Sequence, residues 1–191
     1  MSARTGMIDD KDLIRGDVPF TKGEVRAVTI ARLDIGPEHH ILDIGAGTGT
    51  ITLELARRLD GGLVTAVEKK EKACRLIRAN LEKFDLDNVE LIPGDAPGCL
   101  PNKKWDRIFI GGSGGNLAEL IRYSKIHLRE DGILVINTVT LNTLGEALPL
   151  LKEAGYLTDI TMLQVSKIRE VGQYSMYSGQ NPIHIITAKK E

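Results

Sequence analysis

The segment ILDIGAGTGT, residues 41–50, constrains the fold of this chain more than any other part of the sequence. A short apolar run leads directly into three alternate glycines, Gly45, Gly47 and Gly49, and then into a helix-like segment. Glycines in this position permit a tight turn whose backbone N–H groups stay open to a ligand at the helix N-terminus. The segment therefore predicts a β-strand, a ligand-binding turn and a helix in succession.

Short apolar runs and helix-like segments alternate along the rest of the chain. The predicted strands cover residues 40–45, 63–67, 89–92, 106–111 and 133–137. The helix-like segments between them cover residues 48–59, 71–84, 116–128 and 141–155. Strands that are apolar along their whole length are typical of a parallel sheet with helices on both faces. The alternation predicts an α/β, Rossmann-like, doubly wound fold.

Two more β-like runs, residues 156–165 and 182–188, close the chain with no helix pattern between them. We expect them to form an antiparallel pair at one end of the sheet. Their connection, residues 166–181, is longer than the loops of compact domains usually are. It either extends the hairpin or forms a contact between subunits.

The residues around the glycine turn favour one class of nucleotide ligand. Thr50 stands where a dinucleotide-binding fingerprint requires Gly or Ala, and no Lys follows the turn as in a phosphate-binding loop. Asp43 would repel a pyrophosphate but attract an ammonium or sulfonium group. Glu68 ends the second predicted strand, where a carboxylate can accept both hydroxyls of a ribose. Asp95 and Ala96 follow the third strand and would lie beside an adenine ring, so S-adenosylmethionine satisfies all of these groups.

The motifs ILDIGAGTG, AVEKK and LIPGDAP resemble successive motifs of the class I S-adenosylmethionine-dependent methyltransferases. The resemblance implies a seven-stranded, mostly parallel sheet with helices on both faces and an antiparallel last strand. It also implies a site for the cofactor. The residues of that site are Asp43, Gly45, Ala46, Gly47, Thr48, Gly49, Glu68, Asp95 and Ala96.

The segment after the fourth predicted strand bears on the methyl acceptor. Amino-directed nucleic-acid methyltransferases of this fold often carry an Asp/Asn-Pro-Pro-aromatic motif there, but this chain has GGSGGNL, residues 111–117. Only 4% of the chain is aromatic, so recognition of RNA by base stacking has little support. Gly114 and Gly115 form either a simple turn, with Ser113 or Asn116 capping the next helix, or a bare backbone that admits a broad, flat substrate.

The segment DVPFTKGEVRAV, residues 17–28, carries a second pattern. Thr21 and Glu24 have the spacing of a capping box at a helix N-terminus. The box leaves Lys22 and Arg26 unexplained, four residues apart on one face of the predicted helix. These two form either a solvated basic edge or a binding site for substrate carboxylates.

Together, VPFTKGEVRAV, GAGTGT, GDAP and GGSGGNL resemble the decarboxylating cobalt-precorrin carbon-15 methyltransferases of cobalamin biosynthesis. The resemblance implies methylation of cobalt-precorrin-6B at carbon 15 and loss of carbon dioxide from the acetate on carbon 12. It also implies a homo-oligomer, a tetramer, and a position for Thr21 against the cofactor. A flat tetrapyrrole rich in carboxylates would need open backbone and basic side chains. The substrate-facing candidates are Lys22, Arg26, Gly112, Ser113 and Gly114, with Arg15 or Arg169 as a further cation.

Methyl transfer from a sulfonium is an in-line displacement in which alignment supplies most of the catalysis, so we expect no catalytic triad. His39 and His40 precede the first strand, at the end of the sheet opposite to the ligand edge of such folds. We expect His127 and His184 to be structural. Asn137, which ends the fifth strand, is one more substrate-facing candidate.

Composition limits the remaining functions. The net charge is −1, and Cys74 and Cys99 are the only cysteines and lack metal-ligand spacing. We therefore expect no metal site, no nucleic-acid partner and a reducing cytoplasm. No segment resembles a membrane span or a secretion signal. We expect one methyltransferase domain over residues 1–191, with residues 1–38 covering the ligands. Two alternatives stay open: an RNA methyltransferase of the same fold, and a non-catalytic module that binds S-adenosylmethionine.

Overall fold

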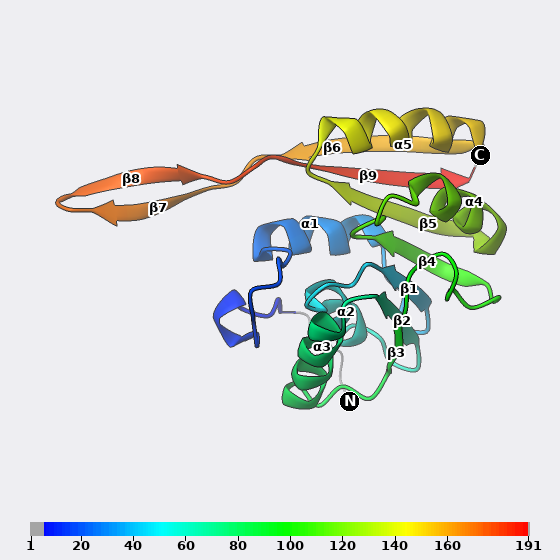
Figure 1. Cartoon of the computed structure of the whole chain (residues 1–191), viewed down its shortest axis with the longest axis horizontal. Coiled ribbons are helices and arrows are strands. Elements are labelled where there is room, and N and C mark those ends of the chain that lie inside the picture. The colour runs from blue at the N-terminus through cyan, green and yellow to red at the C-terminus, as the bar shows by residue number, and fades with distance from the viewer. Residues whose placement is uncertain (1–5, 191) are drawn as a thin grey trace.

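A computed structural model describes residues 6–190 and shows a seven-stranded sheet with helices on both faces (Figure 1). The strands are β1 (His40–Ile44), β2 (Leu63–Glu68), β3 (Val89–Pro93), β4 (Trp105–Ile110), β5 (Leu128–Thr138), β6 (Tyr156–Leu163), β7 (Ser166–Val171), β8 (Tyr174–Gly179) and β9 (Ile183–Lys190). The helices are η1 (Asp10–Asp12), α1 (Gly23–Leu33), α2 (Thr50–Ala56), α3 (Glu71–Lys83), α4 (Leu117–His127) and α5 (Leu141–Glu153).

The strand order of the main sheet is β3-β2-β1-β4-β5-β9-β6. Strands β1 to β5 pair in parallel, and β9 pairs antiparallel with β5 on one side and β6 on the other. The predicted seven-stranded sheet with an antiparallel last strand is confirmed. Ile44 of β1 aligns with Val67 of β2 and Ile110 of β4, so the carboxyl ends of the central strands meet at one edge.

Two layers of apolar side chains fill the space between the sheet and its helices. On one face, Ile30 of α1 and Ile51 of α2 pack with sheet residues such as Val64. On the other face, Leu120 of α4 and Leu151 of α5 belong to a second cluster. The central strands are buried on both faces, which explains why they read as continuous apolar runs.

The long connection between the last two sheet strands forms a second, two-stranded ribbon. Strands β7 and β8 pair with each other and continue the β6–β9 hairpin as an arm that projects from the body (Figure 1). Of the two interpretations of residues 166–181, an extended hairpin is therefore correct. A contact between subunits stays a prediction.

The segment before α1 packs on the body of the protein. The capping of the N-terminus of α1 differs from the prediction. Lys22 occupies the N-cap of α1 with extended backbone (φ −71°, ψ 157°) and makes no side-chain capping bond. The capping box of Thr21 and Glu24 is therefore wrong, because the helix begins one residue later than that box requires. The first five residues of the predicted ligand-covering segment lie outside the described residues.

Candidate active site

Two adjoining cavities open at the carboxyl ends of the central strands. The smaller one has a volume of about 330 Å³ and the larger one about 730 Å³. Four residues line both cavities: Pro19, Gly45, Gly47 and Gly111. The glycine turn therefore lies where the two cavities meet, so groups bound in them can be neighbours.

The glycine turn requires glycine for both conformation and space. The backbone φ values at Gly45, Gly47 and Gly49 are all positive, between 60° and 79°. Residues with a side chain rarely adopt this conformation. A Cβ on Gly45 would lie 2.6 Å from the carbonyl oxygen of Gly112. The first glycine turn and the GGSGG loop thus pack backbone against backbone at Gly45 and Gly112, which explains the glycine at position 45.

Glu68 anchors the turn and faces the smaller cavity. Its side chain is 7% exposed. One carboxylate oxygen accepts a hydrogen bond from the Gly47 N–H at 2.8 Å, and the other accepts one from the Lys70 N–H, also at 2.8 Å. The carboxylate lines the cavity while backbone donors fix its direction. Its place at the end of β2 is the one that the sequence predicts, and its contact with ribose hydroxyls stays a prediction.

The far wall of the smaller cavity holds the third-strand residues and the second glycine loop. Asp95 and Ala96 line it, and Asp95 lies 3.5 Å from the Lys69 ammonium. Gly112, Ser113 and Gly114 also line the smaller cavity and not the larger one, contrary to their predicted role beside the substrate. The packing of this loop on Gly45 turns it toward the smaller cavity.

The predicted cap of α4 is also different in the structure. Asn116 occupies the N-cap position but makes no side-chain capping bond. Its amide nitrogen instead donates to the Ala96 carbonyl at 2.9 Å, and the Asn116 N–H donates to the Ser113 carbonyl at 3.0 Å. The asparagine therefore ties the loop after β4 to the loop after β3.

Asp43 does not point at either cavity. Its side chain is completely buried, and its Oδ2 accepts a hydrogen bond from the Thr52 hydroxyl of α2 at 2.5 Å. Its Oδ1 has no hydrogen-bond partner among residues 6–190. Burial raises the pKa of this carboxyl to about 7, opposed by the Thr52 bond and reinforced by the Glu68 charge. The predicted contact of Asp43 with a positively charged ligand group is therefore contradicted, because the chain turns its side chain away behind the turn.

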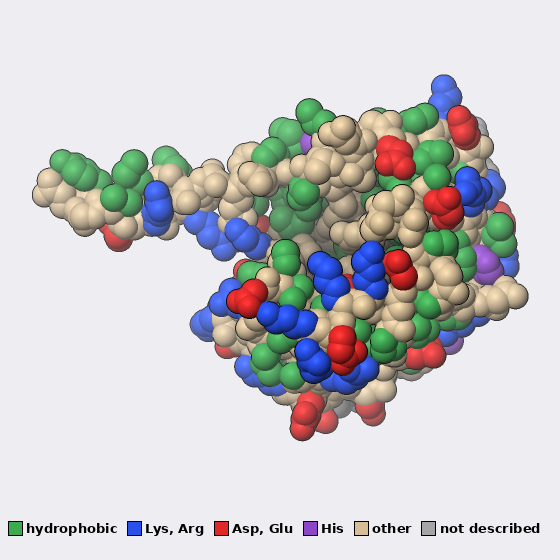
Figure 2. All heavy atoms as spheres, in the orientation of Figure 1, with side chains coloured by type: hydrophobic (Ala, Val, Ile, Leu, Met, Phe, Trp, Pro, Cys, Tyr) green, Lys and Arg blue, Asp and Glu red, His purple; other side chains and the backbone are tan. Residues whose placement is uncertain are grey.

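The larger cavity is lined by cations and by no carboxylate within the described part of the chain. Lys22 comes from the N-terminal segment, and Lys167 and Arg169 come from β7. Figure 2 shows Lys and Arg side chains on both sides of the hollow between the arm and the body. Lys167 also pairs with Glu24 at 2.9 Å. The cavity is thus electropositive in a protein of nearly zero net charge.

Lys167 is the functional candidate that the sequence reasoning missed. It lies two residues before Arg169 on β7, and side chains two apart on a strand point to the same face. A strand assignment for residues 166–171 would therefore have added Lys167 to Arg169.

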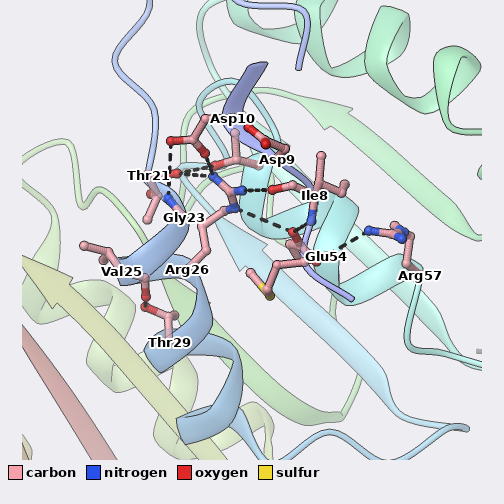
Figure 3. Close-up of polar contacts among 12 residues, drawn as sticks. Ile8, Asp9, Asp10, Thr21, Gly23, Val25, Arg26, Thr29, Glu54 and Arg57 are labelled. Atoms are coloured by element: carbon pink, nitrogen blue, oxygen red, sulfur yellow. Dashed lines mark hydrogen bonds and ion pairs between the residues drawn. The ribbon is translucent and has the colours of Figure 1, made fainter. Parts of the chain in front are cut away.

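Arg26 contradicts its predicted role. Its side chain is completely buried and lines neither cavity. The guanidinium instead binds the Asp10 carboxylate and the carbonyls of Ile8 and Thr21 (Figure 3). Because Lys22 lies outside the helix, the two residues do not share a helix face. Arg15 likewise lines neither cavity, and its guanidinium lies over the Phe20 ring.

The remaining predicted residues lie at the larger cavity. Ala46, Thr48 and Thr21 line it, as does Asn137 at the end of β5. The Asn137 amide nitrogen donates to the Thr29 hydroxyl at 2.9 Å, and that hydroxyl donates to the Val25 carbonyl at 2.8 Å. Gly49 lies at the N-cap of α2 and lines neither cavity.

The histidines lie apart from the cavities. The Nδ1 of His39 accepts a bond from the Gly36 N–H at 3.0 Å, and burial lowers the pKa of the ring. His127 stacks on Tyr123 at 4.1 Å between ring centroids. Neither His40 nor His184 lines either cavity. Across residues 6–190 there is no cluster of His, Cys, Asp or Glu suited to a metal ion, and no helix long and apolar enough to cross a membrane.

In both sequence and structure, the chain is similar to enzymes that modify precorrins. A family model described as a precorrin methyltransferase domain matches residues 12–190. The chain is 35% identical over 184 residues to a cobalt-precorrin-6B C(15)-methyltransferase (decarboxylating) of Salmonella typhimurium, covering 95% of each protein. Its structure resembles a precorrin-6y C5,15-methyltransferase of Geobacter metallireducens, with a TM-score of 0.92, 36% identity and 100% of both chains covered. It also resembles a precorrin 8w decarboxylase of Methanobacterium thermoautotrophicum, with a TM-score of 0.89, 34% identity, and 95% of this chain and 98% of the other covered.

Proposed function

The chain belongs to the precorrin methyltransferase family, and we propose that it methylates carbon 15 of cobalt-precorrin-6B and removes the carbon-12 acetate carboxyl as carbon dioxide. S-adenosylmethionine would be the methyl donor. The observation that carries this proposal is the larger cavity, which joins the glycine turn and holds three cations without a lining carboxylate among the described residues. Such a cavity suits a wide substrate with many carboxylates.

In this proposal S-adenosylmethionine occupies the smaller cavity. The ribose hydroxyls would donate to Glu68, and the adenine would lie beside Asp95 and Ala96. The methionine part would follow the turn of Gly45 to Gly49 toward the junction of the cavities, near Thr21. The methyl group then faces the larger cavity, where Lys22, Lys167 and Arg169 would pair with substrate carboxylates.

The two chemical steps need little from titratable side chains. In the first, an electron pair of the ring carbon forms the new C–C bond while the methyl–sulfur bond breaks and its electron pair stays on sulfur, leaving S-adenosylhomocysteine. In the second, the C–CO₂ bond breaks, its electron pair enters the conjugated ring, and a proton later replaces the carboxyl. The protein's main contribution is to hold donor and acceptor in line at near-attack distance.

The direct test is mass spectrometry of an anaerobic incubation with cobalt-precorrin-6B and S-adenosylmethionine. We expect a product that has gained a methyl group and lost carbon dioxide. Methyl gain alone would assign decarboxylation to another protein. No change, with S-adenosylmethionine bound, would refute the acceptor, and RNA would be tested next.

A charge-removal variant tests the cavity itself. Lys167→Ala combined with Arg169→Ala should raise the KM for the macrocycle roughly tenfold or more, since each lost bond to a charged group contributes about 1.5–3 kcal/mol. The KM for S-adenosylmethionine should stay unchanged. Arg122→Ala on α4, which removes an exposed cation that lines neither cavity, serves as the control.

The proposal also includes a homo-oligomer, a tetramer, in the cytoplasm. The arm leaves apolar side chains exposed, among them Ile168, Tyr174 and Tyr177, and both Cys74 and Cys99 are free thiols, as is usual in a reducing compartment. Light scattering should give four times the mass of one chain, and Tyr177→Lys should lower it.

A further inference from the structure

We propose that Arg26 is a positioning residue that holds residues 17–22 as a strap across the glycine turn and so closes the cofactor cavity. The inference rests on the proposed function in one respect, namely that the smaller cavity binds S-adenosylmethionine. It gives a role to Arg26, which belongs to the segment VPFTKGEVRAV but lines neither cavity.

The strap separates the two cavities. Val18 lines only the smaller cavity, Pro19 lines both, and Lys22 lines only the larger one. The Pro19 carbonyl lies 3.7 Å from the position of a Cβ on Gly47, so the strap passes directly over the turn. One short segment of chain thus contributes to the walls of both ligand sites, and its position affects both.

The strap has few interactions of its own. Asp17 pairs with Lys72 at 2.8 Å, but both side chains are more than half exposed, so this pair stabilises little. Firm attachment lies at the two ends. Before the strap, the Ile14 N–H and carbonyl both bond to the Asn80 side chain, at 2.8 and 3.0 Å. At the other end, within the strap itself, the Thr21 carbonyl accepts from Arg26 Nη1 at 2.8 Å.

Arg26 joins three parts of the protein through one guanidinium (Figure 3). Its Nη1 pairs with Asp10 Oδ1 at 2.5 Å, and its Nη2 donates to the Ile8 carbonyl at 2.5 Å. Its Nε lies 3.7 Å from Glu54 Oε1 on α2, and the same oxygen accepts from the Ile8 N–H at 2.7 Å. The N-terminal segment is therefore tied to α1 and to α2, the helix that follows the glycine turn.

The chemistry of this cluster calls for arginine. A completely buried cation requires paired charges and several acceptors. The planar guanidinium can bond the carboxylate and both carbonyls at once, whereas a lysine ammonium at the end of its chain cannot reach all of them in that fork. Arg26→Lys should therefore keep the positive charge and weaken the hydrogen bonding to the Thr21 carbonyl.

Arg107 provides a matched control. It is also buried, and its guanidinium donates to the Leu33 and Asp34 carbonyls at the end of α1. It lines neither cavity and, within residues 6–190, makes no hydrogen bond to the strap. Arg107→Lys thus removes a comparable buried guanidinium group while leaving the hydrogen bonds of the strap in place.

The experiment combines trypsin cleavage with titration of S-adenosylhomocysteine. Cleavage after Lys22 yields a fragment that begins at Gly23, and its rate follows the population of the detached strap. For Arg26→Lys we expect this rate to rise roughly tenfold and the calorimetric affinity for S-adenosylhomocysteine to fall roughly fivefold or more. Arg107→Lys should change neither, even where thermal unfolding shows a similar loss of stability.

Equal cleavage rates and affinities for the two variants would overturn the inference and leave Arg26 a residue of the fold alone. Should Arg26→Lys fail to fold, Asp10→Asn keeps the arginine, lies at a partly exposed partner, and should shift both readouts in the same direction. Wild-type protein that binds no S-adenosylhomocysteine would refute the proposed cofactor site, while the cleavage rates would still decide the role of Arg26.

Discussion

The free energy of unfolding of an Asp43→Asn variant, relative to that of the wild-type protein, should increase as the pH rises from 5 to 7.5. The Asp43 carboxyl is completely buried, and its pKa is raised from 3.8 to about 7. Between these two values the folded protein holds a proton that the unfolded chain has released. Stability from this group is therefore fully present below about pH 4 and is lost as the pH rises through about 7.

The magnitude depends on the width of that window. Each pH unit in which the folded state holds one extra proton lowers the free energy of unfolding by about 1.4 kcal/mol. From pH 5 to pH 7 the wild-type protein should lose on the order of 2–3 kcal/mol through Asp43. The asparagine side chain of the Asp43→Asn variant carries no charge at any of these pH values, and its carbonyl can still accept from Thr52. The variant should therefore not show this loss.

Urea unfolding of both proteins at about pH 5, 6, 7 and 7.5 measures the difference, and subtraction of the two curves cancels the titration of all other groups. Asp17→Asn is the control, because the exposed Asp17 carboxylate pairs with Lys72, which holds its pKa below the usual value. Asp17 is ionised in both states throughout this range, so its difference should stay flat. A flat difference for Asp43→Asn as well would show that the buried carboxylate is ionised in the folded protein, and the reasoning from burial would be wrong.

The other predictions concern the cavities and the glycine turn. Glu68→Gln cannot accept from both backbone donors that the carboxylate binds, so calorimetric affinity for S-adenosylhomocysteine should fall roughly tenfold; unchanged affinity in a folded variant would contradict the ribose assignment. Gly45→Ala meets the Gly112 carbonyl and a positive φ, and chemical unfolding should show a loss of more than about 2 kcal/mol. Gly112→Ala meets no protein atom of the described residues within 4 Å, so it should keep normal stability and weaken only the cofactor; the reverse pattern would place the ligand elsewhere.

The fold could be predicted because its signals are local. The glycine turn and the apolar strands each depend on residues adjacent in the sequence, and the structure confirms the seven-stranded sheet. The position of Glu68 could be predicted as well, because the end of a buried parallel strand fixes which edge of the sheet a residue can reach, while its contact with a ribose stays a prediction. The edge of the sheet at which a strand-end residue lies can therefore be inferred from the sequence.

The directions of single polar side chains could not be predicted in the same way. A four-residue spacing places Lys22 and Arg26 on one face only if both are helical, and the extended backbone of Lys22 removes that condition. Asp43 lies on a strand that is covered on both faces, so its neighbours in sequence give no sign that Thr52 would receive it. In both cases the partner comes from packing between distant segments, which spacing does not encode.

Because β9 lies between β5 and β6, the main sheet cannot be completed until β9 has been synthesised. Strand β6 leaves the ribosome before β9 and has no other neighbour in the described sheet. Until residues 183–190 emerge, β5 and β6 both present open edges, which other chains can pair with. At a synthesis rate of roughly 5–20 residues per second this interval lasts on the order of seconds. The nascent sheet therefore stays incomplete until β9 closes the gap.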